Sequence, residues 1–217
     1  MATTPAARAS PVYAFAVSSR CLRSSFHQGL RAGFRHQDPA SNDGDTDLKF
    51  RFTQLREIAV DEILALHRDA KVLRHLPLAT GTFDAEACGR WLADKEAQWD
   101  RHGHGPWAIM VDGHFAGWGG LQREGDDADL ALVMSPHYWG LGLPICREIL
   151  RIGFEELGVE SVTARLPASR TRTAGLGRMG FRRDGEVSID GVRFIRFRLS
   201  ASDRQRVCAW RAGTCRD

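Results

Sequence analysis

A strand, a glycine-containing turn and a helix follow one another without interruption in the second half of the chain. Residues 129–135 (DLALVMS) are a nearly continuous apolar run, which is typical of a strand buried on both faces of a sheet. Apolar side chains then recur with helical spacing from Cys146 to Leu157, and Gly140 and Gly142 lie in the turn between the two segments. No other part of the sequence constrains the fold as strongly. The unit predicts an α/β protein in which a buried strand leads directly into an amphipathic helix.

Strand and helix patterns on either side extend this unit into a mixed sheet. Asp112–Gly113 and Asp190–Gly191 each separate two strand-like segments, which is the strongest local signal for a β-hairpin. The other elements follow from the same periodicities: strands at 48–56 and 159–166, and helices at 61–76, from 84 onward and at 169–179. The resulting order, β-α-α-β-β-β-α-β-α-β-β, predicts a sheet of about seven strands with helices on both faces.

The patterned region stops short of both ends of the chain. It covers residues 48–199, which are enough to form one domain with its own core. Residues 1–47 combine an Arg- and Ser-rich, acid-free stretch with a polar linker. We interpret them as a disordered extension or an over-extended gene start, with an organellar targeting segment as the alternative. Residues 200–217 show no clear period and are predicted to be a C-terminal tail.

Composition and charge exclude several classes of protein. With 43% apolar and 26% charged residues, the chain is not collagen-like, coiled-coil or fully disordered, and no apolar stretch is long enough for a membrane span. A net charge of +3 gives no reason to expect nucleic acid as a partner. The five cysteines form no C-x-x-C pair, so we expect no disulfide framework and a reducing, cytoplasmic compartment. His102 and His104 lack a third ligand nearby, and we expect no metal.

Residues 135–143 (SPHYWGLGL) carry the most informative chemistry. No acidic side chain occurs between Asp129 and Glu148, and the glycines let a ligand approach the backbone closely. The amides and the positive end of the helix dipole then favour a phosphate or pyrophosphate, with a plain strand-to-helix turn as the alternative reading. Residues 175–180 (GLGRMG) match the dinucleotide-binding pattern in letters only, because the required order of strand, glycines and helix is missing.

The segment HYWGLG (137–142) resembles the acetyl-CoA pyrophosphate loop of the GNAT superfamily, whose pattern is Gln/Arg-x-x-Gly-x-Gly/Ala. Its Y-W-G-x-G form resembles the ribosomal-protein-N-acetyltransferase (Rim-like) branch, as do DADLALVMSP (127–136) and GRMGF (177–181). The resemblance covers residues 48–199. It implies a GNAT fold, with a mixed, mostly antiparallel central sheet that splays open after the fourth strand.

The resemblance also implies an activity: direct transfer of an acetyl group from acetyl-CoA to a primary amine. The acceptor is expected to be a protein N-terminal α-amine or a small-molecule amine, and the protein a monomer or homodimer. The alternative is a catalytically degenerate GNAT domain that binds CoA or a partner without turnover. A Tyr that protonates the leaving thiolate is common in the family, but Tyr13 and Tyr138 are the only tyrosines and neither is well placed.

Residue roles follow from the same resemblance. The backbone of the turn would hold the pyrophosphate, and His137 occupies the usual Gln/Arg position. Val133 and Met134 would pair their backbone with the pantetheine arm, and Ser169 falls where the branch often has a cofactor-contacting Asn. The predicted cofactor set is therefore Val133, Met134, His137, Tyr138, Trp139, Gly140, Leu141, Gly142, Leu143 and Ser169.

The acceptor side is predicted separately. Asp129 stands where the branch often has Glu and is the candidate general base, because a carboxylate on that strand is suited to accept the proton of the incoming ammonium. Glu124, Asp126 and Asp127 are competing candidates. Trp107 and Trp118 are predicted to line the amine pocket, together with the loop at 101–106, with plain core packing as the alternative.

Overall fold

We describe the protein from a computed structural model, which covers residues 50–125, 127–170 and 173–204. These residues form one seven-stranded sheet in the order β1-β2-β3-β4-β5-β7-β6. Its strands are β1 (Phe50–Thr53), β2 (Pro106–Val111), β3 (His114–Glu124), β4 (Asp127–Met134), β5 (Ser161–Pro167), β6 (Arg182–Ile189) and β7 (Val192–Ser200). Neighbouring strands are antiparallel except for β4 and β5, which are parallel. The predicted mixed, mostly antiparallel sheet is confirmed.

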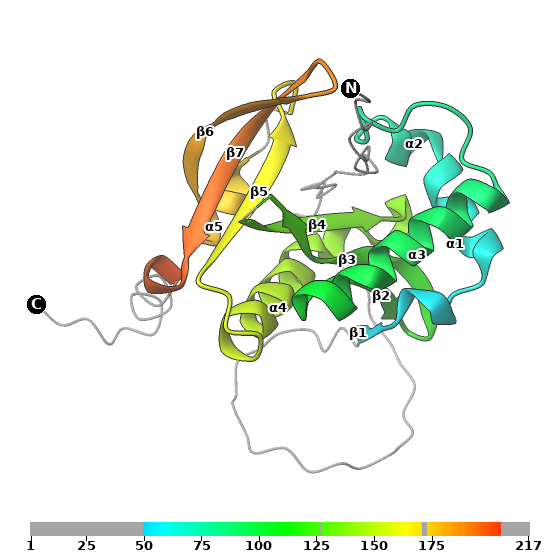
Figure 1. The fold of residues 1–217 in the computed structure, drawn as a ribbon, viewed down its shortest axis with the longest axis horizontal. Coiled ribbons are helices and arrows are strands. Elements are labelled where there is room, and N and C mark those ends of the chain that lie inside the picture. The colour runs from blue at the N-terminus through cyan, green and yellow to red at the C-terminus, as the bar shows by residue number, and fades with distance from the viewer. Residues whose placement is uncertain (1–49, 126, 171–172, 205–217) are drawn as a thin grey trace, which may run out of the picture.

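Helices cover both faces of this sheet (Figure 1). They are α1 (Val60–Arg68), α2 (Ala70–Leu73), α3 (Ala85–His102), α4 (Gly142–Glu155) and α5 (Ala174–Arg178), with the short 3₁₀ helices η1 (Leu55–Glu57) and η2 (Pro136–Leu141). Apolar residues of α1, α2 and α3 pack with Trp118, Ala131 and Val133 on one face. Those of α4 and α5 pack with Leu121, Leu130 and Leu132 on the other. The alternation of side chains along β3 and β4 thus builds a core on each side of the sheet.

The sheet opens between β4 and β5, as predicted. These strands pair only through Ala128 with Val162 and Asp129 with Thr163, although β4 continues to Met134 and β5 to Pro167. Figure 1 shows β4 and β5 diverging beyond this point. The second half of β4 therefore has one edge that no neighbouring strand covers within the described chain. This opening is the feature of the fold that positions the candidate site.

Local chemistry explains where several elements begin and end. The predicted helix at 61–76 is interrupted at Asp69, whose side chain accepts hydrogen bonds from Lys71 and Val72 and so starts α2 afresh. The side chain of Asp84 caps α3 in the same way. Helix α4 begins at Gly142, before Pro144. The predicted helix at 169–179 is formed only over α5, and residues 171 and 172 lie outside the described chain.

The Asp-Gly pairs form hairpin turns as predicted. Asp112 and Gly113 have φ of 49° and 84°, and Asp190 and Gly191 have φ of 47° and 78°. Positive φ at both central residues is the requirement of the type I′ turn, which matches the twist of the strands it joins. These turns set the register of β2 with β3 and of β6 with β7.

The terminal segments are described only in part. Residues 1–47 and 205–217 lie outside the described residues, so the predictions for the extension and most of the tail stay predictions. β7 ends at Ser200, and Arg204 beyond it lies 2.8 Å from a carboxylate oxygen of Glu155 on α4. In the part of the chain that is described, no helix is both long and apolar enough to cross a membrane.

Candidate active site

Strand β4 directs alternate backbone groups into the opening beside β5. The amide of Ser135, just after β4, donates to the carbonyl of Ala116 at 2.8 Å and so faces β3. Counting back along β4, the backbone amide and carbonyl groups of successive residues alternate between facing the opening and facing β3. Met134 therefore presents its backbone groups to the opening, whereas Val133 presents its own to β3. The indole of Trp139 donates to the Met134 carbonyl at 2.9 Å. Of the two residues predicted to pair with a pantetheine arm, only Met134 has its backbone on that side.

The turn predicted to hold a pyrophosphate forms η2 and the first residues of α4. Neither helix has an acidic residue in its first turn, and no side chain from the described residues caps α4. His137 and Gly140 are exposed, and a Cβ added at Gly140 would meet no described atom within 4 Å. Gly142 is buried at the first position of α4. The remaining members of the turn are half-buried against the core on the α4 side: Tyr138, Trp139, Leu141 and Leu143. The surface around Gly140 is therefore the part of the turn that a ligand can approach.

Basic side chains gather beside this turn. The ring of His75 lies edge-on to that of Trp139, with centroids 5.5 Å apart. Burial lowers the pKa of His75, and the charges of Arg170 and Arg74 lower that pKa further, so both guanidinium groups lie close enough to act on it. Ser169 is exposed in the turn that precedes Arg170. Positive potential at this end of the opening favours an anionic ligand.

Asp129 lies at the opposite end of the opening, where β4 and β5 part. Its side chain is 3% exposed, and its Oδ1 accepts a hydrogen bond from Thr163 Oγ1 at 2.7 Å. The Nε of Arg165 lies 3.4 Å from the same oxygen. Burial raises the pKa of Asp129 to about 6, although Arg165 and Thr163 favour the charged form. Asp129 is thus ionised at neutral pH and takes up a proton more readily than an ordinary aspartate.

The competing acidic residues are engaged differently. Glu124 accepts a hydrogen bond from Arg165 Nη1 at 3.2 Å, and burial raises its pKa to about 7. Asp127 accepts hydrogen bonds from Arg198 of β7 at 2.8 and 3.2 Å, in an ion pair that links two strands. Asp126 lies outside the described residues. Asp129 and Glu124 therefore share Arg165 as an acidic pair at the opening, and Asp127 serves the sheet.

Gln122 completes this polar cluster, and the sequence analysis missed it. It pairs with Asp129 across β3 and β4, is fully buried, and has no hydrogen-bond partner among the described residues for either side-chain polar atom. Directly paired antiparallel residues share a face, so the Gln122 amide lies beside the Asp129 carboxylate. Both polar atoms are therefore available to hydrogen-bond with a ligand or a water. The sequence could have indicated this, because Gln122 follows Trp118 and Gly120 at every second position of the same strand and therefore shares their face of the sheet.

Lys95 is a second buried polar residue that the sequence analysis missed. It lies on the face of α3 that also carries Cys88 and Trp91, and its side chain is 2% exposed. Its ammonium group lies 3.6 Å from Asp94, and burial lowers its pKa. The sequence could have indicated this, because Lys95 follows Cys88 and Trp91 at helical spacing and therefore lies on the same buried face of the helix.

The tryptophans predicted to line one amine pocket point to opposite faces of the sheet. Trp118 is fully buried on the α1–α3 side, where its indole donates to His67 Nε2 at 3.0 Å. Its partner across β2 is Ala108, so the neighbouring Trp107 points to the other face, with its ring 5.2 Å from that of Phe52. The prediction that both line one pocket is corrected: Trp118 alone shares the face of Asp129.

The loop at 101–106 is held by the fold. His104 is buried, and its Nδ1 lies 3.0 Å from the carbonyl of Leu121. The rings of His102 and His104 are 6.1 Å apart. Among the described residues no group of three or more His, Cys, Asp or Glu side chains is placed to hold a metal ion.

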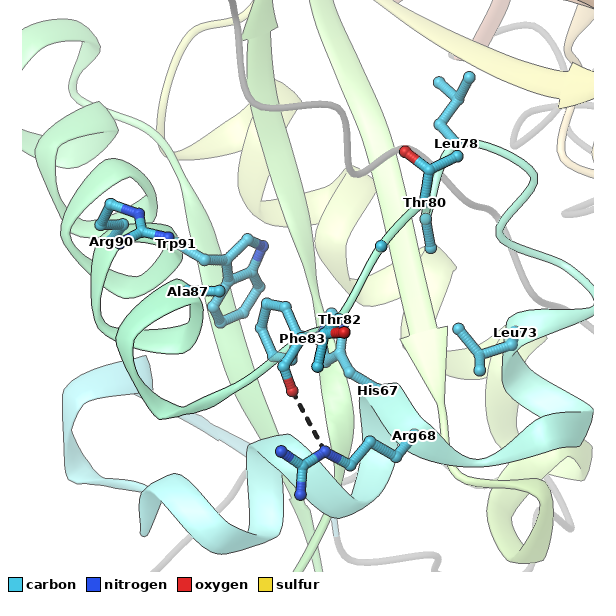
Figure 2. Close-up of a pocket in the computed structure, with 12 residues that line it drawn as sticks. His67, Arg68, Leu73, Leu78, Thr80, Thr82, Phe83, Ala87, Arg90 and Trp91 are labelled. Atoms are coloured by element: carbon cyan, nitrogen blue, oxygen red, sulfur yellow. Dashed lines mark hydrogen bonds between the residues drawn. The ribbon is translucent and has the colours of Figure 1, made fainter.

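A cavity of about 430 Å³ lies on the α1–α3 side of the sheet. It is lined by residues of α1, α2, α3 and the segment at 78–83, and Figure 2 shows their side chains. Trp118 of β3, the partner of Val133 on β4, connects to this cavity through its hydrogen bond to His67. Leu78 reaches across to pack on Phe194 of β7. The cavity therefore lies on the face of the sheet that carries Trp118, and the segment with Leu78 runs from its wall to β7.

The sequence of residues 49–182 matches the family described as acetyltransferase (GNAT) domain. The chain belongs to the GNAT acetyltransferase family. The match spans the strands and helices around the opening, from β1 through α5 to the first residue of β6. A search of curated proteins gives no match.

Solved structures share the GNAT fold with this chain at low sequence identity. A GnaT-family acetyltransferase from Bordetella pertussis is 18% identical with a TM-score of 0.60, and the alignment covers 72% of this chain and 98% of that one. An acetyltransferase from T. thermophilus is 20% identical with a TM-score of 0.54, covering 76% and 95%. Spermidine N-acetyltransferase from Vibrio cholerae, solved in complex with CoA and spermine, is 11% identical with a TM-score of 0.59, covering 74% and 99%.

Proposed function

We propose that this GNAT protein transfers an acetyl group from acetyl-CoA directly to a primary amine. The observation that carries the proposal is the opening of the sheet between β4 and β5, with an acid-free turn at one end and a buried carboxylate at the other. The turn and its basic neighbours would hold an anionic group, and Asp129 would accept a proton. The solved spermidine N-acetyltransferase in complex with CoA and spermine supports this class of reaction.

The residues present fit acetyl-CoA. The open surface at Gly140, the uncapped start of α4 and the basic groups His75, Arg170 and Arg74 suit a pyrophosphate. The backbone of Met134 faces the opening and would pair with the pantetheine arm, as an added strand pairs with a sheet edge. Acetyl-CoA would supply the acetyl group as an activated thioester: the deprotonated amine would form the new C–N bond, the C–S bond would break, and CoA would leave as its thiolate.

The chain's own groups prepare the acceptor amine. In this proposal Asp129 takes the proton of the incoming ammonium, directly or through a water, and Gln122 orients that ammonium or water with its partnerless amide. Arg165 and Thr163 fix the carboxylate in place. Burial raises the pKa of the thiols of Cys88 and Cys146, which disfavours the thiolate form of either. This supports direct transfer without a cysteine intermediate.

The finer assignments remain proposals on sequence grounds. The Y-W-G-x-G turn supports the ribosomal-protein branch and hence a protein N-terminus as acceptor, whereas the solved spermidine N-acetyltransferase supports a small amine. Cysteine usage supports work in the cytoplasm. The alternative of a degenerate domain that binds CoA without turnover is favoured by the position of Tyr138. It is the one tyrosine among the described residues, and it lies in η2, away from Asp129, where it is not well placed to protonate a leaving thiolate.

The proposal is tested by calorimetric titration of acetyl-CoA into the full chain. The Gly140→Glu variant places a negative charge on an open surface of the turn, so we expect it to weaken binding at least about tenfold while the protein stays folded. Gly140→Gln is the matched neutral control. Gly177→Glu is a second control. It puts the same charge at an equally open position in the GLGRMG segment (175–180), outside the turn, and we expect it to bind acetyl-CoA normally.

Thiol release with a panel of amines then separates enzyme from binding module. Release that depends on the amine supports the proposed activity. Tight binding without release by any amine supports the degenerate reading, and equal affinity in Gly140→Glu and Gly140→Gln contradicts the assignment of the turn.

A further inference from the structure

The cavity of about 430 Å³ beside His67 offers hydrogen-bond donors without an opposing carboxylate. Of the described residues that line it, none is acidic, and the polar ones are His67, Arg68, Thr80, Thr82, Arg90 and Trp91. Figure 2 shows these side chains surrounding one space, with the rest of the wall formed by apolar groups such as Leu73, Leu78 and Phe83. Its size is that of a small-molecule site.

Trp91 supplies the observation that points to a ligand. Its side chain is buried, with 3% exposure, and its indole nitrogen has no hydrogen-bond partner among the described residues. Figure 2 shows the ring projecting from α3 toward the segment that carries Thr80 and Thr82. An indole N–H only donates, so the missing partner is an acceptor. A buried donor left in this state costs free energy unless something binds to it.

His67 adds a second donor to the same cavity. Its Nε2 accepts the hydrogen bond of Trp118, and burial lowers its pKa to about 4, with the charge of Lys95 acting in the same direction. The imidazole is therefore neutral at physiological pH and carries its proton on Nδ1. Both buried polar side chains of the lining are thus donors.

Guanidinium groups stand at the rim of the cavity. Arg68 is exposed and donates its Nε to the carbonyl of Phe83 at 3.1 Å, which holds it beside the cavity. Arg90 pairs with Glu86 one turn earlier on α3, where both side chains are mostly exposed. Arg68 therefore brings positive charge to the rim, whereas Glu86 balances the charge of Arg90, and a polycationic acceptor would meet like charge at Arg68.

We propose that this cavity binds the carboxylate end of an acceptor amine, so that the substrate class is a small, partly apolar amino acid or related amino carboxylate. The inference rests on the proposed function for the identity of the ligand as an acceptor. The donors at Trp91, His67 and Arg68 take the carboxylate, and the apolar wall takes the carbon skeleton. Trp118 joins His67 to the face of the sheet on which Val133 of β4 lies, and in this inference the amine of the ligand extends from the cavity along that face toward the opening.

Binding of a charge-matched ligand set to the full chain tests this inference without turnover. The probes are 3-phenylpropionate, phenylalanine, phenethylamine and spermidine, titrated by calorimetry at pH 7.5. We expect the two carboxylates to bind at least about tenfold more tightly than the two amines, since hydrogen bonds to a charged group are worth roughly that factor. Inorganic phosphate is titrated in parallel as the other common oxyanion.

Variants locate the binding. Trp91→Phe removes the indole N–H and keeps a ring, and Arg68→Gln removes the rim charge; each is expected to weaken 3-phenylpropionate about tenfold. The matched controls are Trp99→Phe, at the far end of α3 where the indole donates to the Pro106 carbonyl, and Arg56→Gln, both with unchanged affinity. Near-ultraviolet circular dichroism confirms that Trp91→Phe is folded.

Each outcome decides the inference. Amines that bind as tightly as carboxylates, phosphate that binds more tightly than 3-phenylpropionate, no binding of any probe at millimolar concentration, or unchanged affinity in both variants would overturn it. Thiol release is scored separately. Carboxylate binding without acetyl transfer would remove the proposed function and keep the site, whereas acetyl transfer to spermidine in preference to phenylalanine would keep the function and remove this inference.

Discussion

At the scale of single residues, the burial of Asp129 affects both the stability of the fold and the acid–base chemistry of its carboxyl group. Its burial where β4 and β5 part raises its pKa to about 6, because removing the ionised carboxylate from water costs free energy. Arg165 and Thr163 offset part of that cost through Oδ1. A buried carboxylate that is ionised near neutral pH and still basic enough to accept a proton matches the requirement of a general base.

The Asp129→Asn variant keeps the shape of the side chain and removes its proton-accepting capacity. We expect kcat to fall about 10²-fold or more, with the acetyl-CoA dissociation constant little changed. In the wild type, kcat/KM should rise with pH through about 6 as Asp129 ionises, and this limb should vanish in the variant. Glu124→Gln is the comparison, because Glu124 shares Arg165. Loss of the limb in Glu124→Gln alone would transfer the role to Glu124.

The same variant has a second readout that does not depend on activity. The folded state holds the proton of Asp129 more tightly than the unfolded chain does, so this residue's contribution to stability falls as pH rises from about 4 to about 6. The Asp129→Asn variant has no carboxyl group at this position, so its stability does not fall with pH for this reason. Denaturant unfolding should show the stability of the variant, relative to wild type, rising by about 1 kcal/mol between pH 5 and pH 8. A flat difference would mean that Asp129 has an ordinary pKa.

At the scale of elements, the glycines of β3 set how closely its neighbours pack. Gly117 has φ of 150°, and a Cβ there would lie 2.2 Å from the carbonyl oxygen of Val133 on β4. Gly120 has φ of 156°, and a Cβ there would lie 2.4 Å from the carbonyl oxygen of Gly105. The obstacles are backbone atoms, which cannot turn away as a side chain can. Strand β3 therefore needs glycine at these positions for its contacts with β4 and with the start of β2.

The same chemical change at Gly117 and at Gly89 is expected to shift the free energy of unfolding in opposite directions. We expect Gly117→Ala to lower the free energy of unfolding by roughly 2–4 kcal/mol, through backbone strain and the clash with β4. Gly89 is exposed in α3 with no described atom within 4 Å of an added Cβ, so Gly89→Ala should raise that free energy by up to about 1 kcal/mol. Denaturant titration measures both. Equal effects of the two substitutions would contradict the close packing of β3 on β4, because helix propensity and strain act in opposite directions.

At the scale of the whole molecule, the opening leaves the two parts of the sheet weakly joined. Strands β5, β6 and β7 meet β4 through the short parallel pairing at Ala128 and Asp129, through the contacts of Thr163 and Arg165 with Asp129, and through the shared core against α4 and α5. Arg198 of β7 adds a bond across this junction: it binds Asp127 of β4 and Asp184 of β6, each at 2.8 Å. The ion pairs of Arg198 thus join β4, β6 and β7 at this junction.

Arg198→Gln should therefore loosen this junction. The group is partly exposed, so we expect a loss of about 1 kcal/mol and a Tm lower by roughly 2–4 °C. Hydrogen exchange should increase in β5 and β7 more than in β2 and β3. Arg193→Gln, which removes an exposed ion pair with Glu186 on the same hairpin, is the control and should change neither quantity. An unchanged exchange pattern in Arg198→Gln would show that the strand pairing and the shared core hold the junction without Arg198.

Periodicity and turn chemistry in the sequence determined the order of the elements and the hairpins at Asp112–Gly113 and Asp190–Gly191. These features depend on neighbouring residues, so local patterns predict them. The acid-free turn was found in the same way, because its amides, glycines and following helix are contiguous, and its resemblance to the GNAT loop implied the opening after the fourth strand. The departures were local too: Asp69 restarts a helix that the periodicity continued.

Only the tertiary structure decided which distant residues share a surface. It paired Gln122 with Asp129, placed Lys95 in the core, and set Trp107 and Trp118 on opposite faces. It also gave the backbone of Met134, and not that of Val133, to the opening. Strand register and helix packing fix these relations, and a one-residue change of register would reverse every one of them on β4. For that reason local patterns in the sequence located the contiguous turn at 135–143, but they did not show which side chains gather around Asp129.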